Sequence, residues 1–213
     1  MGRATTARSA GHKQIRSIIS TGYTSVTSQA ITIPRTIAGD TIVCLVSTSG
    51  SPTITGSSTG GSWRTIQGGN AAPYVWMVIG IPTAGTTSFT LTISASSTLS
   101  TVTTILSGVN SSPLSGLSSV SWGWTSASGN TSTSFTPNIG DVVVIGLSQF
   151  SGTSVTATDS RGQQVQNRGL NNTNSRPVAL LSFVDRTGLS QTISPVWNNA
   201  QTGGGLIVVF PHL

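Results

Sequence analysis

Residues 39–46 read Gly-Asp-Thr-Ile-Val-Cys-Leu-Val, and residues 140–147 read Gly-Asp-Val-Val-Val-Ile-Gly-Leu. Each stretch is a Gly-Asp pair followed by a short apolar run rich in β-branched residues, which is the pattern of a turn leading into a buried β-strand. The two stretches lie 101 positions apart. A turn and a strand that recur at this distance indicate that one building block occurs twice in the chain.

The same spacing relates other parts of the two halves. Gly22-Tyr23-Thr24-Ser25 aligns with Gly123-Trp124-Thr125-Ser126, and the match continues without a gap as far as Gly68 and Gly169. Beyond that point the alignment needs a shift of two or three residues. A repeat of this length predicts two domains, because solenoid repeats are only about 20–50 residues long.

Short apolar runs separated by Gly, Ser, Pro and Asn predict an all-β chain with almost no helix. We expect strands near residues 28–33, 41–48, 52–56, 63–67, 74–81, 87–94 and 101–108, and again near 119–126, 131–136, 142–149, 153–158, 163–166, 178–184, 189–194 and 205–210. About seven strands per hundred residues is typical of antiparallel sandwiches.

The predicted architecture is therefore two tandem, similar antiparallel β-sandwich units of the jelly-roll or immunoglobulin-like kind, related by an internal repeat of about 101 residues. A basic arm at 1–20 precedes a first unit at 21–114 and a second unit at 115–213. The alternative is one larger two-sheet barrel whose halves came from the same unit.

Ionisable side chains are scarce in this sequence. Charged residues make up 7% of the 213 residues, whereas about 25% is usual. The chain has no Glu, four Asp, one Cys, and His only at positions 12 and 212. Acid–base pairs, nucleophile–base pairs and metal sites all need several such groups in one place. We therefore predict a protein that is not an enzyme, with no catalytic residue, metal or cofactor.

Cys44 and the apolar runs carry no sign of redox chemistry or of membrane insertion. Cys44 lies within an apolar strand and is expected to be a small buried hydrophobic residue. The chain has no apolar run of about 18 residues, the length that a membrane helix needs. The segment at 1–20 has basic groups without the apolar core of a secretory signal.

Positive charge is concentrated at the start of the chain. Arg3, Arg8, Lys13 and Arg16 supply four of the ten basic residues, and the first acidic residue is Asp40. Such an arm can lie along an acidic protein surface or neutralise nucleic-acid phosphates. No aromatic residue is interleaved for base stacking, so protein docking or simple solvation is favoured and nucleic-acid binding stays open.

Gly39-Asp40 and Gly140-Asp141 are interpreted as structural turns. Glycine supplies positive φ, and an aspartate carboxylate accepts hydrogen bonds from nearby backbone N–H groups, which sets where the next strand begins. Asp185-Arg186 is interpreted as another turn, with an ion pair on the surface. Residues 163–176 form the most polar stretch of the body and are expected to be an exposed loop.

Trp122 and Trp124 lie two residues apart on an expected strand and so face the same side of a sheet. Tyr23 occupies the repeat position of Trp124, which favours packing in the core or between the units. The alternative is an exposed pair that anchors a protein interface or stacks on sugar rings.

Several segments together resemble a loose group of β-sandwich proteins found among phage virion proteins and bacterial surface or secreted proteins. They are PRTIAGDTIV at 34–43, Gly-Gly-Ser-Trp at 60–63, Tyr-Val-Trp at 74–76, Ala-Gly-Thr-Thr at 84–87, Leu-Ser-Gly-Val at 106–109 and Ser-Pro-Leu at 112–114. The resemblance covers residues 28–210 and brings no functional residue set with it.

What the resemblance implies is a structural virion protein of a tailed phage, either a capsid decoration protein or a tail or fibre component. It would be located in the virion, occur in several copies and dock on a major capsid or tail protein through the basic arm. Two alternatives remain open. One is a coat protein whose arm contacts packaged nucleic acid; the other is a carbohydrate-binding adhesin that uses Trp122 and Trp124 or the 163–176 loop.

Overall fold

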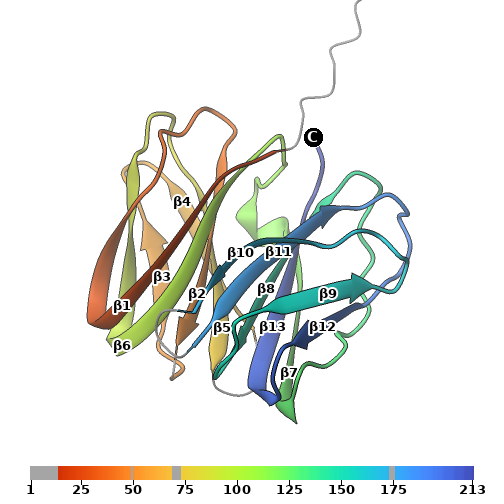
Figure 1. Cartoon of the computed structure of the whole chain (residues 1–213). Helices are drawn as coiled ribbons and strands as arrows, with labels where there is room; N and C mark the ends of the chain where they lie inside the picture. The colour runs from red at the N-terminus through yellow and green to blue at the C-terminus, as the bar shows by residue number, and fades with distance from the viewer. Residues whose placement is uncertain (1–13, 49, 69–72, 173–175) are drawn as a thin grey trace, which may run out of the picture.

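The computed structural model describes residues 14–48, 50–68, 73–172 and 176–213, and these form an all-β chain (Figure 1). The strands of the first half are β1 (Gln14–Thr32), β2 (Thr41–Thr48), β3 (Ile54–Ser57), β4 (Ser62–Gly68), β5 (Tyr74–Ile81) and β6 (Ser88–Ser107). Those of the second half are β7 (Ser118–Ala127), β8 (Val142–Gln149), β9 (Val155–Asp159), β10 (Gln166–Asn171), β11 (Val178–Val184), β12 (Ile193–Trp197) and β13 (Gln201–Phe210). Within the described ranges the one helical element is the 3₁₀ turn η1 (Leu114–Gly116). The predicted all-β class is confirmed.

The strands form three antiparallel sheets. The first has the order β1-β6-β2-β5-β4, with β3 paired to β6. The second has the order β10-β11-β8-β13-β7, and the third consists of β12 and β9. When the second sheet is read from β7 to β10, its strands follow the same order as those of the first sheet from β1 to β4.

The six-stranded first sheet and the five-stranded second sheet pack face to face around a shared middle core. On the first sheet this core contains Val43, Leu45 and Met77, and on the second it contains Val144 and Leu180. Each of these residues is 0% exposed to solvent. Neither half therefore has this core to itself.

Each sheet also has a second core on its outer face. In the first half, Cys44 and Trp76 pack against residues of β1, β3 and the beginning of β6. In the second half, Ile145 and Leu181 pack against β9 and β12. Strands β2 and β8 are thus buried at every position, because alternate side chains enter the middle core and an outer core.

Two pairs of residues, one member from each half, make contact where the two sheets meet. The hydroxyl oxygens of Ser47 and Ser148 lie 2.5 Å apart in a buried hydrogen bond. Leu45 covers Gly146, where an added Cβ would lie 2.8 Å from Leu45 Cδ2. Each pair is separated by the 101 residues of the expected repeat.

Both ends of the described chain lie at one end of the strands, which we name the arm end (Figure 1). Gln14 begins β1 opposite Ser107, and His212 forms a bridge with Val109. The turns that lead into β2 and β8 are at this same end, because each strand starts opposite the last residues of its neighbour, β6 or β13.

Several strand predictions differ from the structure. Strand β1 begins at Gln14, so residues 14–20, which were assigned to the arm, pair with β6. The two strands expected at 87–94 and 101–108 form one continuous β6. The strand expected at 131–136 is reduced to a single bridge between Phe135 and Gln191, since Gly, Pro and Asn flank a segment with few apolar residues.

The pairing register differs at one point from the expected alignment of the two halves. Val75 and Val178 both lie opposite the matched serines Ser47 and Ser148. Gly68 pairs with Val75, and Asn171 pairs with Val178. By strand register, Gly68 thus occupies the place in the first sheet that Asn171, rather than Gly169, occupies in the second.

Candidate interaction site at the arm end

Asp40 and Asp141 hold two turns of the same geometry at the arm end. Asp40 Oδ2 accepts the backbone N–H of Ile37, and Asp141 Oδ2 accepts that of Asn138, both at 2.8 Å. Gly39 and Gly140 precede them with φ of 85° and 92°. These contacts are those expected of structural turns.

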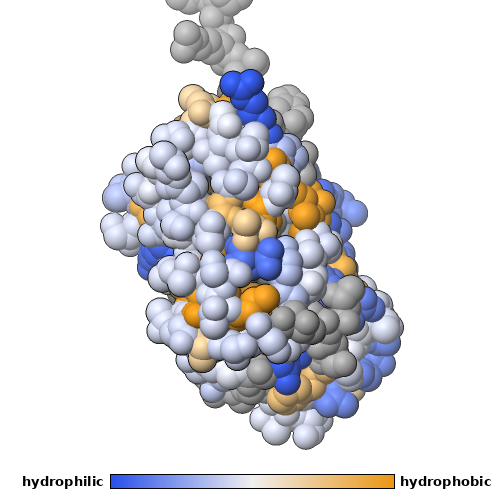
Figure 2. All heavy atoms as spheres, turned by 90° about the vertical axis from the view of Figure 1, so that its left-hand side faces the viewer, coloured by the Kyte–Doolittle hydropathy of each residue, from blue (hydrophilic) through white to orange (hydrophobic). Residues whose placement is uncertain are grey.

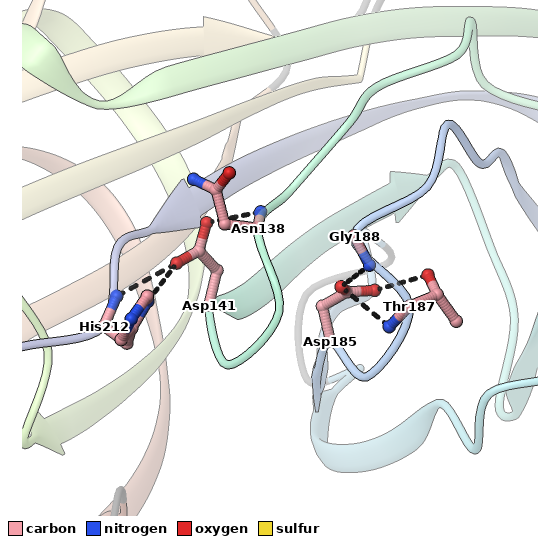
Figure 3. Close-up of polar contacts among 6 residues, drawn as sticks. All are labelled: Asn138, Asp141, Asp185, Thr187, Gly188 and His212. Carbon is pink, nitrogen blue, oxygen red and sulfur yellow. Dashed lines mark hydrogen bonds and ion pairs between the residues drawn. The ribbon is translucent and has the colours of Figure 1, made fainter.

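The second oxygen of each carboxylate ties down the end of a strand. Asp40 Oδ1 accepts the Ser107 hydroxyl at 2.6 Å. Asp141 Oδ1 accepts the backbone N–H of His212 at 3.0 Å and lies 3.1 Å from His212 Nδ1 (Figure 3). Both carboxylates are buried, so they act within the fold.

The other two aspartates are also buried inside turns. Asp159 Oδ2 accepts backbone N–H groups at 2.9 and 3.2 Å. Asp185 accepts the backbone N–H of Gly188 at 2.7 Å and that of Thr187 at 3.1 Å (Figure 3). Burial would raise the pKa of Asp185, but hydrogen bonds from Gly188, Gln163, Thr187 and Gln191 outweigh it and hold the pKa below its usual value.

This arrangement corrects the surface ion pair expected at Asp185-Arg186. The Asp185 carboxylate is 1% exposed and is used by the turn. The Arg186 side chain is exposed and pairs with no acid among the described residues. All four aspartates of the chain are at most 6% exposed. The positive charges at the surface therefore have no exposed aspartate beside them.

Trp122 and Trp124 are 5% exposed and belong to the outer core of the second half. The Trp122 ring covers Gly205 and the Trp124 ring covers Gly203, and a Cβ at either glycine would collide with the indole. Trp122 Nε1 donates a hydrogen bond to the Asn130 carbonyl oxygen at 2.7 Å. This burial agrees with the favoured packing interpretation and rules out the exposed pair, because neither ring has an open face for a sugar or a partner.

Large apolar side chains are exposed in the turns of the arm end. Ile37 is 57% exposed, Ile139 is 62% exposed and Leu189 is 52% exposed. Ile139 is close to Gly188, where an added Cβ would lie 3.2 Å from Ile139 Cγ1. Sequence reasoning missed these residues, although an isoleucine one or two positions before each Gly-Asp pair was a signal that could have found Ile37 and Ile139.

The rest of the visible surface is weakly polar. Figure 2 looks onto the side of the first half and shows mainly pale residues, with small separate apolar patches and few strongly polar ones.

Of the basic arm, Arg3, Arg8 and Lys13 lie outside the described residues. Arg16 lies in β1. The arm therefore joins the body at the end that carries the exposed isoleucines.

No group of three or more His, Cys, Asp or Glu that could hold a metal occurs in the described part of the chain. Burial raises the pKa of the Cys44 thiol to about 12, against a lesser lowering effect of the Thr103 side chain. Among the residues with a described conformation there is no helix long and apolar enough to cross a membrane.

No protein-family model, no curated protein and no solved structure matches this chain. The fold and the site define the class: an all-β protein whose aspartate carboxylates are hydrogen-bonded inside turns and whose arm end exposes apolar side chains.

Proposed function

We propose that this chain is a non-enzymatic structural protein of a tailed-phage virion, a capsid decoration protein or a tail or fibre component, that docks through its arm end. The observation that carries the proposal is the combination at that end of exposed Ile37 and Ile139 with the attachment point of a basic arm. Apolar side chains surrounded by polar ones are typical of protein contact sites.

The charge distribution favours an acidic protein surface as the docking partner. The first 16 residues carry four basic side chains, and the arm-end aspartates Asp40 and Asp141 are 1% and 2% exposed. Cationic groups without exposed acids beside them are available to pair across an interface. Copies placed on a symmetric shell or tube would repeat this contact many times.

We also propose that the two halves are copies of one β-sandwich unit, joined at 108–117 and packed about an approximate twofold axis along the strands. Three features support this relation: the common strand order, the contact between Ser47 and Ser148, and a non-glycine residue with positive φ at the same place in each half. Ser25 and Ser126, 101 residues apart, are the non-glycine residues with positive φ in the described chain, at 53° and 50°. A unit that buries both faces of its main sheet in this way makes a stiff body for a particle surface.

The test uses particles of the phage that encodes the chain, grown with its gene deleted, and the purified full-length protein carrying a fluorescent label. Co-sedimentation should show saturable binding of the full chain. Removal of residues 1–13, or the substitution Ile139→Asp, should weaken binding about tenfold or more, since a buried isoleucine contributes about 1.5–3 kcal/mol. Val196→Asp is the matched control, because Val196 is 53% exposed but lies in β12 of the outer layer.

Failure of the full chain to bind these particles would overturn the proposal. A second readout separates the coat-protein alternative. If the arm holds nucleic acid, the affinity for a DNA duplex would fall with salt at a log–log slope of up to about −2.7, from about −0.9 for each of the three basic residues at 1–13. If removal of residues 1–13 abolishes DNA binding but leaves particle binding unaffected, the arm contacts the packaged genome and does not dock the chain on the particle.

A further inference from the structure

A cavity of about 390 Å³ lies in the second half, at the edge of the second sheet. Its walls are the loop at 162–164, Gln166 and Arg168 of β10, Phe183 and Val184 at the end of β11, and Arg186 in the turn after it. This volume is within the usual range of small-molecule sites, about 300–1,000 Å³. No residue of the basic arm or of the exposed apolar set Ile37, Ile139 and Leu189 lines it.

Two arginines face this cavity without a carboxylate partner. Arg168 Nε donates to the hydroxyl of buried Ser182 at 3.0 Å, which orients the guanidinium and leaves its terminal nitrogens for other acceptors. Arg186 lines the same cavity, and neither arginine forms an ion pair with a described residue. Partial burial lowers the pKa of Arg168, as expected for a cation removed from water without a counter-charge.

The nearest acid cannot neutralise them. The two oxygens of Asp185 accept hydrogen bonds from Gly188 and Thr187 (Figure 3). They also accept hydrogen bonds from Gln163 and Gln191, which leaves no free oxygen for the guanidinium of Arg186.

Gln163 makes this arrangement rigid. Its Nε2 donates to Asp185 Oδ1 at 2.8 Å and to Gln191 Oε1 at 2.7 Å, and its Oε1 accepts the backbone N–H of Arg186 at 2.7 Å. The main chain that carries Arg186 is therefore held in place beside the cavity. Because the Arg168 guanidinium and the backbone of Arg186 are already held in place, less entropy is lost there when a ligand binds.

We infer that this cavity binds an acidic saccharide unit, a sugar that carries a carboxylate or a sulfate group. Guanidinium groups match the geometry of both oxyanions through paired N–H donors. The amide side chains of Gln164 and Gln166, which also line the cavity, supply the donors and acceptors that sugar hydroxyls need. Nucleic acid is disfavoured because the aromatic residue of the site, Phe183, is 5% exposed and has no open face for a base.

The experiment is titration calorimetry of the full chain with three probes: an oligogalacturonate, a sulfated dextran oligosaccharide and neutral dextran of the same length. Binding of one or both acidic probes, and none of the neutral probe, is expected. Arg186→Gln and Arg168→Gln should each weaken that binding about tenfold or more, since hydrogen bonds to charged groups are strong. Arg35→Gln removes the same charge from an exposed site in the first half and should leave it unchanged.

Three outcomes would overturn the inference: neither acidic probe binds at millimolar concentration, both arginine variants bind as the parent does, or a single-stranded oligonucleotide binds more tightly than the sugars with the same loss in the variants. The Arg186 side chain makes no hydrogen bond or ion pair with a described residue. That variant should therefore fold even if loss of the Arg168–Ser182 bond disturbs the other. Removal of residues 1–13 should not affect sugar binding, so this inference and the proposed docking fail independently.

Discussion

The contact between Leu45 and Gly146 allows a direct test of the shared middle core, because the two residues come from different halves. Leu45 is fully buried, so Leu45→Ala should lower the free energy of unfolding by about 3 kcal/mol through lost burial and an unfilled cavity. Gly146→Ala places a Cβ 2.8 Å from Leu45 Cδ2 and 3.3 Å from Val75 Cγ2. Overpacking of this kind costs about 1–3 kcal/mol.

Alanine also stabilises a strand by about 0.5–1 kcal/mol relative to glycine. In the parent protein the net effect of Gly146→Ala is therefore a loss of about 1 kcal/mol. In the Leu45→Ala background the main obstacle is gone and the new methyl group fills part of the cavity. The same substitution should then raise the free energy of unfolding by about 0.5 kcal/mol.

Urea unfolding at 25 °C, followed by tryptophan fluorescence, measures all four proteins of this cycle. Leu91→Ala is the control background, since Leu91 is also fully buried but lies in the outer core of the first half. In the Leu91→Ala background, Gly146→Ala should change the free energy of unfolding by the same amount as in the parent protein. If Gly146→Ala has the same effect in the parent and in Leu45→Ala, within about 0.5 kcal/mol, the two halves do not share this contact.

Three further predictions concern single residues. Cys44, with a pKa of about 12, should not react with a thiol reagent at pH 8 in the native protein and should react fully in urea; rapid native labelling would contradict its burial. The lowered pKa of Asp185 stabilises the fold above the usual carboxyl pKa of 3.8, and this contribution is lost as the pH falls through the lower folded value. Asp185→Asn should therefore destabilise the protein at pH 7 and flatten the decline of stability below about pH 4, as acid titration of unfolding would show; an unchanged acid limb would count against this role. Gly205→Ala should destabilise by about 1–3 kcal/mol because of the Trp122 ring, whereas Gly116→Ala, where the nearest atom is 3.8 Å away, should stay within about 0.5 kcal/mol; equal melting temperatures would refute the packing.

The strands that the sequence predicts best are those buried on both faces. Expected bounds of 41–48, 74–81, 142–149 and 178–184 agree with β2, β5, β8 and β11. A continuous apolar run bounded by turn residues was enough for these strands, because both faces meet a core. The beginning of β1 was missed because Arg16 and its basic neighbours suggested an arm, while the segment is held by pairing with the end of β6, which is distant in sequence.

The interaction site was less predictable. The Gly-Asp turns follow from local chemistry, since carboxylate and N–H groups lie within three residues of each other. The burial of Trp122 and Trp124 depends on glycines of β13, the last strand of the chain, which clear space for the indoles. The arginine cavity likewise joins β10 to the turn after β11, and no local pattern shows that Asp185 is occupied by Gln163 and Gln191.

Electron cryomicroscopy of purified particles of the encoding phage tests the proposed docking most directly. The arm end, with the turns at 37–40 and 138–141, should face the shell or tube, and density for residues 1–13 should continue into the neighbouring subunit. Particles without density for this chain, or with the opposite ends of the strands against the shell, would contradict it.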